Sequence, residues 1–242
     1  MIPLRDANPS RTTPLVTYVL ILINALVFFY QLSLGKNVAV FFDFYGIIPA
    51  KYFYLGAEEG VNFFGRFFPF FTSQFLHGGF LHVIGNMWFL WVFGDNIEDH
   101  LGRFKFILFY LLCGVAAGLT HVYTNPSSQI PTVGASGAIA GVMGAYTLLF
   151  PRARVKTLIP IFYFIQIVDL PAFLFLGIWF VLQFFSGAIS LAAGGATGGV
   201  AWWAHIGGFV VGIVLILILP KRKEVSQVPK IMGSASRNFF DD

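Results

Sequence analysis

Three separated segments of the sequence carry side chains that could perform nucleophilic chemistry. Ser136 lies among small residues in the tetrapeptide GASG at 134–137, and His205 lies in the apolar stretch AHIGGFVVG. A histidine within hydrogen-bond distance of a serine activates the hydroxyl as a nucleophile. His82 and Asn86 are four residues apart, so on a helix they share a face and could offer donors to an oxyanion. We therefore ask which elements could bring these residues together.

The composition indicates an integral membrane protein. Of the 242 residues, 57% are hydrophobic and 11% charged, whereas a soluble domain has about 45–50% apolar and about 25% charged residues. This length accommodates six or seven spans of about 20 residues and little else. The single Cys113 excludes an internal disulfide. Basic residues beside the spans account for the net charge, so the expected partner is the lipid bilayer and not nucleic acid.

Apolar runs predict an all-α fold with six transmembrane helices. Thr13 and Pro14 are expected to be the N-cap and the first-turn proline of the first helix, which is too long for the core of a cleavable signal peptide. The aromatic-rich loop 35–72 is expected to lie in the bilayer interface as short amphipathic helices. The expected spans cover about residues 13–34, 78–93, 104–122, 136–150, 171–190 and 200–219.

The remaining segments complete the expected organisation. The proline-interrupted run 157–168 is short for a span and typical of an interfacial or re-entrant segment. A polar N-terminal segment, 1–12, precedes one membrane domain, 13–219, and a basic tail, 220–242, is expected to be disordered. With the N-terminus inside, 12 of the 15 Lys and Arg residues lie on the inner side, as the positive-inside rule requires. Both termini are thus expected in the cytoplasm, and the membrane is expected to be the plasma membrane of a prokaryote.

This topology places the candidate residues at one depth. The second, fourth and sixth spans all run from outside to inside, and His82, Ser136 and His205 lie near their outer ends. A lone histidine is often only a partner in helix packing, and a serine beside glycines is often simply small. Polar side chains inside a bilayer are costly, however, and three at one depth favour a functional site.

Small residues predict that the fourth and sixth spans pack closely. A four-residue spacing lines one helix face with small side chains, which allows two helices to approach each other. The faces are Gly137, Gly141 and Ala145 on one span, and Ala204, Gly208 and Gly212 on the other. If these faces meet, Ser136 and His205 come within reach of each other.

The same arrangement predicts an oxyanion site and a source of water. The backbone N–H of Ser136 at a helix start, together with His82 and Asn86, could hold an oxyanion. The fourth span, 15 residues long, is about 22 Å of helix against a hydrocarbon core of about 30 Å. Ser136 should therefore lie below the outer surface, reached by the uncharged loop 125–133 in a wet cavity, with the Gly-rich loop 194–199 as a candidate mobile cap.

A carboxylate partner for His205 is not evident. The only acids expected on the outer side are Asp43, Glu58 and Glu59, and nothing in the sequence ties them to the histidine. We therefore predict a Ser–His dyad without an acid.

The motifs closely resemble those of the rhomboid intramembrane serine proteases. These motifs are GASG at 134–137, the His82-x3-Asn86 pair and AHIGGFVVG at 204–212, within about residues 60–215. The resemblance implies a six-helix core, Ser136 as nucleophile, His205 as base, and His82 and Asn86 as oxyanion stabilisers. It also implies that the substrates are single-span membrane proteins cut in or near their transmembrane segment, and that no cofactor is needed.

Two positions depart from the family pattern. Gly65-Arg66 stands where the first loop of the family commonly has Trp-Arg. Ala140 replaces the tyrosine that often stacks on the catalytic histidine, so other packing must orient His205. Phe173, Phe175 and Trp179 make the fifth span bulky, either as a gate or as a lipid-facing surface.

Three other functions were weighed. A zinc protease is disfavoured because His77 and His82 are five residues apart and no HExxH pattern is present, so no metal is expected. A transporter is disfavoured because no ionisable pair lies at the bilayer midplane and no repeat is evident. A catalytically silent binding or quality-control factor of the same fold is the main alternative. The sequence does not define the oligomeric state.

Overall fold

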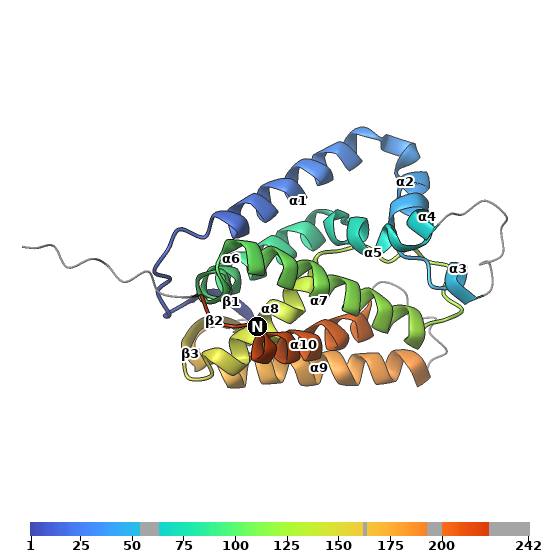
Figure 1. Ribbon diagram of the computed structural model, residues 1–242. Coiled ribbons are helices and arrows are strands. Elements are labelled where there is room, and N and C mark those ends of the chain that lie inside the picture. The colour runs from blue at the N-terminus through green and yellow to red at the C-terminus, as the bar shows by residue number, and fades with distance from the viewer. Residues whose placement is uncertain (54–62, 162–163, 193–199, 223–242) are drawn as a thin grey trace, which may run out of the picture.

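The computed structural model describes residues 1–53, 63–161, 164–192 and 200–222. Most of this chain is helical, and the long helices run side by side between two ends that differ in structure (Figure 1). A small sheet of β1, β2 and β3 lies at one end, and short helices gather at the other end. The long helices are α1 (Leu15–Ser33), α6 (Phe80–Leu101), α7 (Arg103–Thr124), α8 (Ser136–Leu149), α9 (Ala172–Ala192) and α10 (Trp202–Ile218).

The loop after α1 folds into short helices, as its aromatic sequence predicts. Whether they lie in the bilayer interface stays a prediction. The short helices are η1 (Gly35–Asn37), α2 (Val38–Tyr45), α3 (Ala50–Phe53), α4 (Phe63–Phe67), α5 (Pro69–Thr72) and η2 (Ser73–Phe75).

Helix α8 forms the centre of the bundle. Every residue from Gly137 to Tyr146 is buried, whereas α9 exposes large apolar side chains such as Phe173 and Leu182, at 53% and 56%. Such exposed apolar surface suits contact with lipid.

α1, α7 and α9 are long and apolar enough to cross a membrane, and residues 65–101 add a fourth span if their two helices, bent by 81°, are counted together. The chain is thus a membrane protein, and the six expected spans stay a prediction because α8 and α10 have only 14 and 17 residues.

The junction of α1 and α6 differs from the prediction in two ways. The N-cap of α1 is Pro14, without a side-chain bond, so the predicted Thr13 cap is wrong. Instead, the Glu98 carboxylate accepts hydrogen bonds from the backbone N–H groups of Val16 and Thr17 at 2.9 and 2.8 Å. Helix α6 therefore extends past its predicted end at residue 93, because this buried acid has partners. It ends at Leu101 and is followed by the C-cap Gly102, whose φ of 78° suits glycine.

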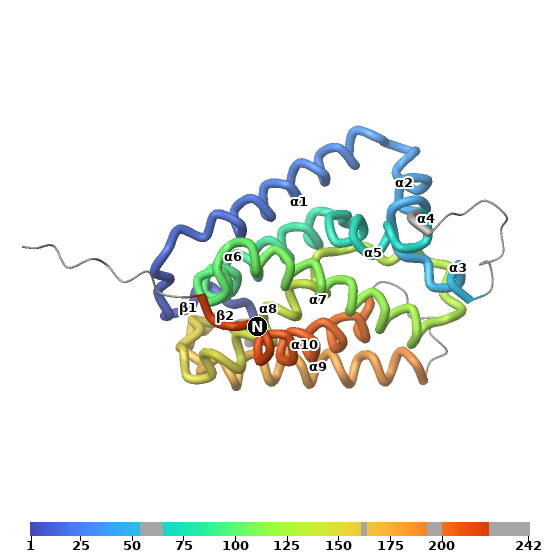
Figure 2. The backbone as a smooth tube through the Cα atoms, in the orientation of Figure 1, coloured from blue at the N-terminus to red at the C-terminus, as the bar shows by residue number. Residues whose placement is uncertain are grey.

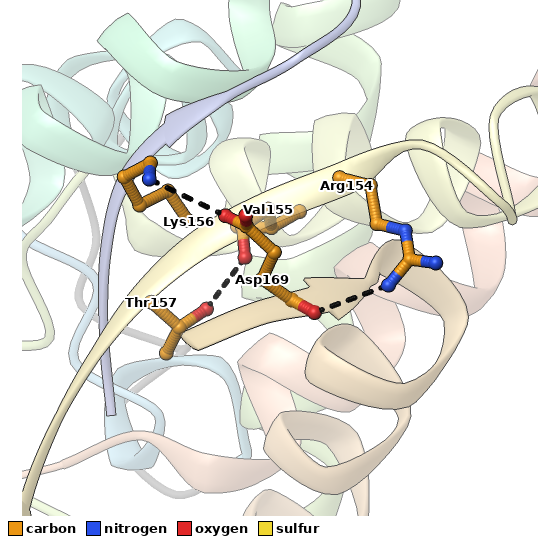
Figure 3. Close-up of polar contacts among 5 residues, drawn as sticks. All are labelled: Arg154, Val155, Lys156, Thr157 and Asp169. Atoms are coloured by element: carbon orange, nitrogen blue, oxygen red, sulfur yellow. Dashed lines mark hydrogen bonds and ion pairs between the residues drawn. The ribbon is translucent and has the colours of Figure 1, made fainter. Parts of the chain in front are cut away.

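A three-stranded antiparallel sheet corrects the all-α prediction. β1 (Ile2–Asp6) pairs with β2 (Arg154–Ile161), which pairs with β3 (Phe164–Pro171). The run 157–168, predicted as interfacial or re-entrant, thus belongs to a β-hairpin, and its many β-branched residues favour a strand. Figure 3 shows how Asp169 joins the two strands: its carboxylate lies 3.7 Å from the Lys156 ammonium, and its carbonyl accepts from Arg154 at 3.3 Å.

Segments predicted on the inner side lie together at the sheet end of the bundle (Figure 2). The N–H of Ala7 donates to the carbonyl of Arg154, and the N–H of Arg222 donates to that of His100, each at 2.8 Å. The Lys105 ammonium donates to the carbonyl of Pro220 at 2.8 Å. Glu58, Glu59, the 194–199 loop and nearly all of the predicted disordered tail lie outside the described residues.

Candidate active site

Helices α8 and α10 touch through their backbones. A Cβ added to Gly208 would lie 2.1 Å from the carbonyl oxygen of Gly137, and one added to Gly212 would lie 2.1 Å from that of Gly141. Both distances are far below van der Waals contact, so larger residues cannot be accommodated without moving a helix. The buried Ala204 continues this face of α10 by one turn, and its carbonyl lies 3.9 Å from the Cβ position of Gly137.

This packing places Ser136 beside His205. Ser136 is the first residue of α8, and His205 lies in the first turn of α10. The Ser136 Oγ is 2.8 Å from Nε2 of His205, within the range of an O–H to nitrogen hydrogen bond. A hydroxyl and an imidazole in this geometry can exchange a proton, which is the requirement for nucleophilic activation.

Residues of α9, together with Trp202 of α10, surround the other side of the His205 ring. The Gln183 carboxamide oxygen lies 2.6 Å from Nδ1 of His205. The ring centroids of Trp179 and His205 are 5.9 Å apart, with an angle of 34° between the ring planes. The Trp202 ring meets the imidazole nearly edge-on, at a centroid distance of 6.4 Å. These contacts supply the packing that Ala140, buried within α8, cannot provide.

Gln183 is not among the site residues predicted from the sequence. A polar side chain inside a membrane helix is a functional hypothesis by default, so the one amide in the apolar α9 run was a usable signal. The bulky residues of α9 lie on two sides of the helix, one packed against the protein and one exposed. Phe175 is buried at 1% exposure and Trp179 packs on His205, whereas Phe173 is 53% exposed.

Two of the residues proposed for the oxyanion site, His82 and Ser136, meet at Gly134. Its φ is 135°, and a Cβ there would lie 2.7 Å from Nε2 of His82 and 3.5 Å from the Ser136 Oγ. The N–H of Gly78 donates to Nδ1 of His82 at 3.4 Å, which leaves the proton of a neutral ring on Nε2. The Asn86 Nδ2 is buried and donates to no group in the part of the chain that the structure describes. His82 can therefore offer a donor next to the serine, and Asn86 can offer one from the wall of the same cavity.

A large cavity connects these groups. Its volume is about 1430 Å³, and its walls include Ser136, His205, His82 and Asn86 together with the polar loop 125–134. The N–H of Gly134 donates to the carbonyl of Ser73 at 2.9 Å. This bond fixes the end of the loop beside Ser136. The polar groups in these walls can bind water, which hydrolysis requires.

The histidines do not form an evident metal site. The His77 and His82 rings lie 5.1 Å apart. Among the described residues, however, no group of three or more His, Cys, Asp or Glu side chains is placed to hold a metal ion.

The fold and the site define a helical membrane protein in which a half-buried serine lies beside a buried histidine, in a cavity with both polar and apolar walls. A family model described as Rhomboid domain matches residues 65–222. The match covers more than half of the sequence, so the chain belongs to the rhomboid family.

Relatives of several sources support this assignment. Rhomboid protein 1, mitochondrial, of Saccharomyces cerevisiae is 30% identical over 173 residues, which are 69% of this chain and 46% of the yeast protein. Rhomboid-like protein 11, chloroplastic, of Arabidopsis thaliana is 28% identical over 71% of this chain and 59% of its own length. Putative rhomboid protease YdcA of Bacillus subtilis is 30% identical over 57% of this chain and 64% of its own length. The chain thus spans roughly half of the first two proteins. These two are named as organellar proteins and the third is bacterial, so the expected prokaryotic plasma membrane stays a prediction.

Proposed function

We propose that this protein is an intramembrane serine endopeptidase. The observation that carries the proposal is the 2.8 Å contact between the Ser136 Oγ and Nε2 of His205 in a membrane-protein cavity whose walls include polar side chains. Ser136 attacks the carbonyl carbon of the scissile peptide, and His205 accepts the hydroxyl proton and later gives it to the leaving amine. Water then hydrolyses the acyl-enzyme with His205 again as the base.

The oxyanion formed in this step is held by three donors. These are the backbone N–H of Ser136, at the positive end of the α8 dipole, Nε2–H of His82 and the Asn86 amide. The chemistry needs no cofactor. The substrates are single-span membrane proteins, cut in or near the transmembrane segment, which reach the cavity within the bilayer.

The topology belongs to the same proposal. The six long helices form one membrane domain, 13–219, with the short helices of the first loop in the outer interface. The sheet, residues 1–12 and the tail 220–242 lie on the cytoplasmic side, which accounts for the bias of Lys and Arg. At about 21 Å, α8 is shorter than the hydrocarbon core, so Ser136 lies below the outer surface.

Cleavage of a reporter in proteoliposomes tests the function. The reporter is a single-span protein with a tag on each side, incubated with the wild type or with Ser136→Ala. We expect two fragments with the wild type and none with the variant. The silent binding factor would be supported if the folded wild type cleaves no such reporter. Wild type and Ser136→Ala would then change the cellular abundance of a partner protein to the same extent.

A further inference from the structure

The Gln183 carboxamide and Ser136 contact the two different nitrogens of one imidazole. Gln183 Oε1 lies 2.6 Å from Nδ1 of His205, and the Ser136 Oγ lies 2.8 Å from Nε2. Gln183 and His205 are buried at 8% and 9% exposure. Water thus competes little for the ring, and the protein partners determine where its proton lies.

The direction of the two hydrogen bonds decides whether His205 can act as a base. A neutral imidazole has one N–H donor and one acceptor nitrogen. To take the serine proton, Nε2 must be the acceptor, so Nδ1 must carry the proton and needs an acceptor of its own. A carboxamide oxygen supplies this acceptor. The reverse amide orientation would donate to Nδ1 and place the ring proton on Nε2, facing Ser136.

We propose that Gln183 is a positioning residue that holds His205 in the tautomer with an unprotonated Nε2. The inference rests on the proposed function, because the tautomer matters only if His205 acts as the base. In this role a neutral amide takes the place of the carboxylate partner that the sequence does not supply for His205. It orients the ring without placing a negative charge inside the bilayer, which is costly.

Three variants test the role through the kinetics of reporter cleavage. Gln183→Leu removes the acceptor, and kcat should fall by about 10- to 100-fold, the usual effect of losing the partner that orients a histidine, with KM nearly unchanged. Gln183→Glu keeps an acceptor and should restore kcat to within a few-fold of the wild type. The new carboxylate stabilises the imidazolium, so the acid limb of the pH profile should move to higher pH. Leu182→Met is the matched control on the 56% exposed neighbour.

Other titratable groups of the cavity also contribute to the pH profile of cleavage. His82 from α6 and His121 from α7 line the same space as His205. They are identical in all three variants, so a shift seen only with Gln183→Glu reports on His205. A wild-type kcat in Gln183→Leu, or Gln183→Glu as slow as Gln183→Leu without a shift, would overturn the proposal.

Nitrogen NMR of histidine-labelled protein gives a readout that needs neither activity nor a stable variant at position 183. The His205 signals are identified by their absence in His205→Ala. At neutral pH we expect the Nδ1–H tautomer in the wild type, and a wild-type ring protonated on Nε2 would refute the assignment. If the tautomer is as expected but neither the wild type nor Ser136→Ala cleaves the reporter, the proposed function fails separately.

Discussion

Gly134 is the residue at which backbone conformation and side-chain packing make the same demand. Its φ of 135° lies in a region that other residues rarely adopt, and the space for a Cβ is taken by the His82 ring. A residue with a Cβ at this position would be strained, at a cost of order 1–3 kcal/mol.

Gly134→Ala should therefore damage the site more than the fold. The new methyl group must displace His82 or Ser136, so we expect reporter cleavage to fall by at least about tenfold, since each 1.36 kcal/mol of lost transition-state stabilisation is a factor of ten. Gly177→Ala on α9 is the control, because a Cβ there meets nothing within 4 Å. Equal activity of the two variants would show that the contact between Gly134 and His82 is dispensable.

The pairing of Ser136 with His205 could be predicted from residue types and spacing, whereas the contacts of Gln183 and Trp179 could not. Small residues at four-residue spacing specify which faces of α8 and α10 meet. No comparable pattern specifies how α9 rotates against α10. The residues of α9 that face His205 therefore become evident only in three dimensions.

At the scale of elements, the close approach of α8 and α10 determines the geometry of the pair. Each helix offers glycines where the carbonyls of the other approach, so the distance between the axes depends on the absence of side chains there.

Gly208→Leu should abolish reporter cleavage although Ser136 and His205 remain. The leucine must push α10 from α8, because its Cβ alone would lie 2.1 Å from the Gly137 carbonyl oxygen. Overpacking also typically costs about 1–3 kcal/mol of stability. Val210→Leu, on the same helix at a position 46% exposed, is expected to be nearly silent in both measurements. A fully active Gly208→Leu protein would refute the packing argument.

The junction of α6 with α1 should contribute strongly to stability. Glu98 is 2% exposed and also accepts from the Thr17 hydroxyl at 2.9 Å. Glu98→Ala leaves two buried N–H groups at the start of α1 without this acceptor, at a cost of about 1–3 kcal/mol.

Thermal unfolding in detergent can compare this variant with Asp169→Asn. The Asp169 side chain is 55% exposed in its ion pair with Lys156, and such surface pairs contribute about 0–1 kcal/mol. We expect a clear loss of thermal stability only for Glu98→Ala, and similar losses in both would contradict the assigned role of Glu98.

The helices were easier to predict from the sequence than the strands. Long apolar runs gave the approximate bounds of α1, α7 and α9. The end of α6 was missed because Glu98 resembles a connector residue until its partners in α1 are known. The sheet could not be predicted because β1 and β2 are about 150 residues apart in the sequence, and no local pattern specifies their pairing.

At the scale of the whole molecule, β1 links the N-terminal segment to the core. The Tyr146 hydroxyl of α8 donates a hydrogen bond to the Asp6 carboxylate. Burial raises the pKa of Asp6 from 3.8 to about 6, although the Tyr146 bond opposes the shift, and the nearby Asp95 adds to it.

A raised carboxyl pKa makes the folded state bind protons more readily than the unfolded state. The stabilisation is fully present below the unfolded pKa and is lost as the pH rises through the folded pKa of about 6. Unfolding scans between about pH 4 and pH 7 should show wild-type stability falling relative to Asp6→Asn as the pH rises. Parallel curves for the two proteins would contradict this role of Asp6.

The central claim is that His205 activates Ser136 inside the membrane domain. Labelling of the purified protein with a fluorophosphonate, followed by mass spectrometry of the labelled peptide, tests it most directly. We predict a covalent adduct on Ser136 in the wild type, none in Ser136→Ala, and much slower labelling in His205→Ala. Equal labelling of Ser136→Ala and the wild type, or labelling of Ser136 that does not depend on His205, would contradict the account.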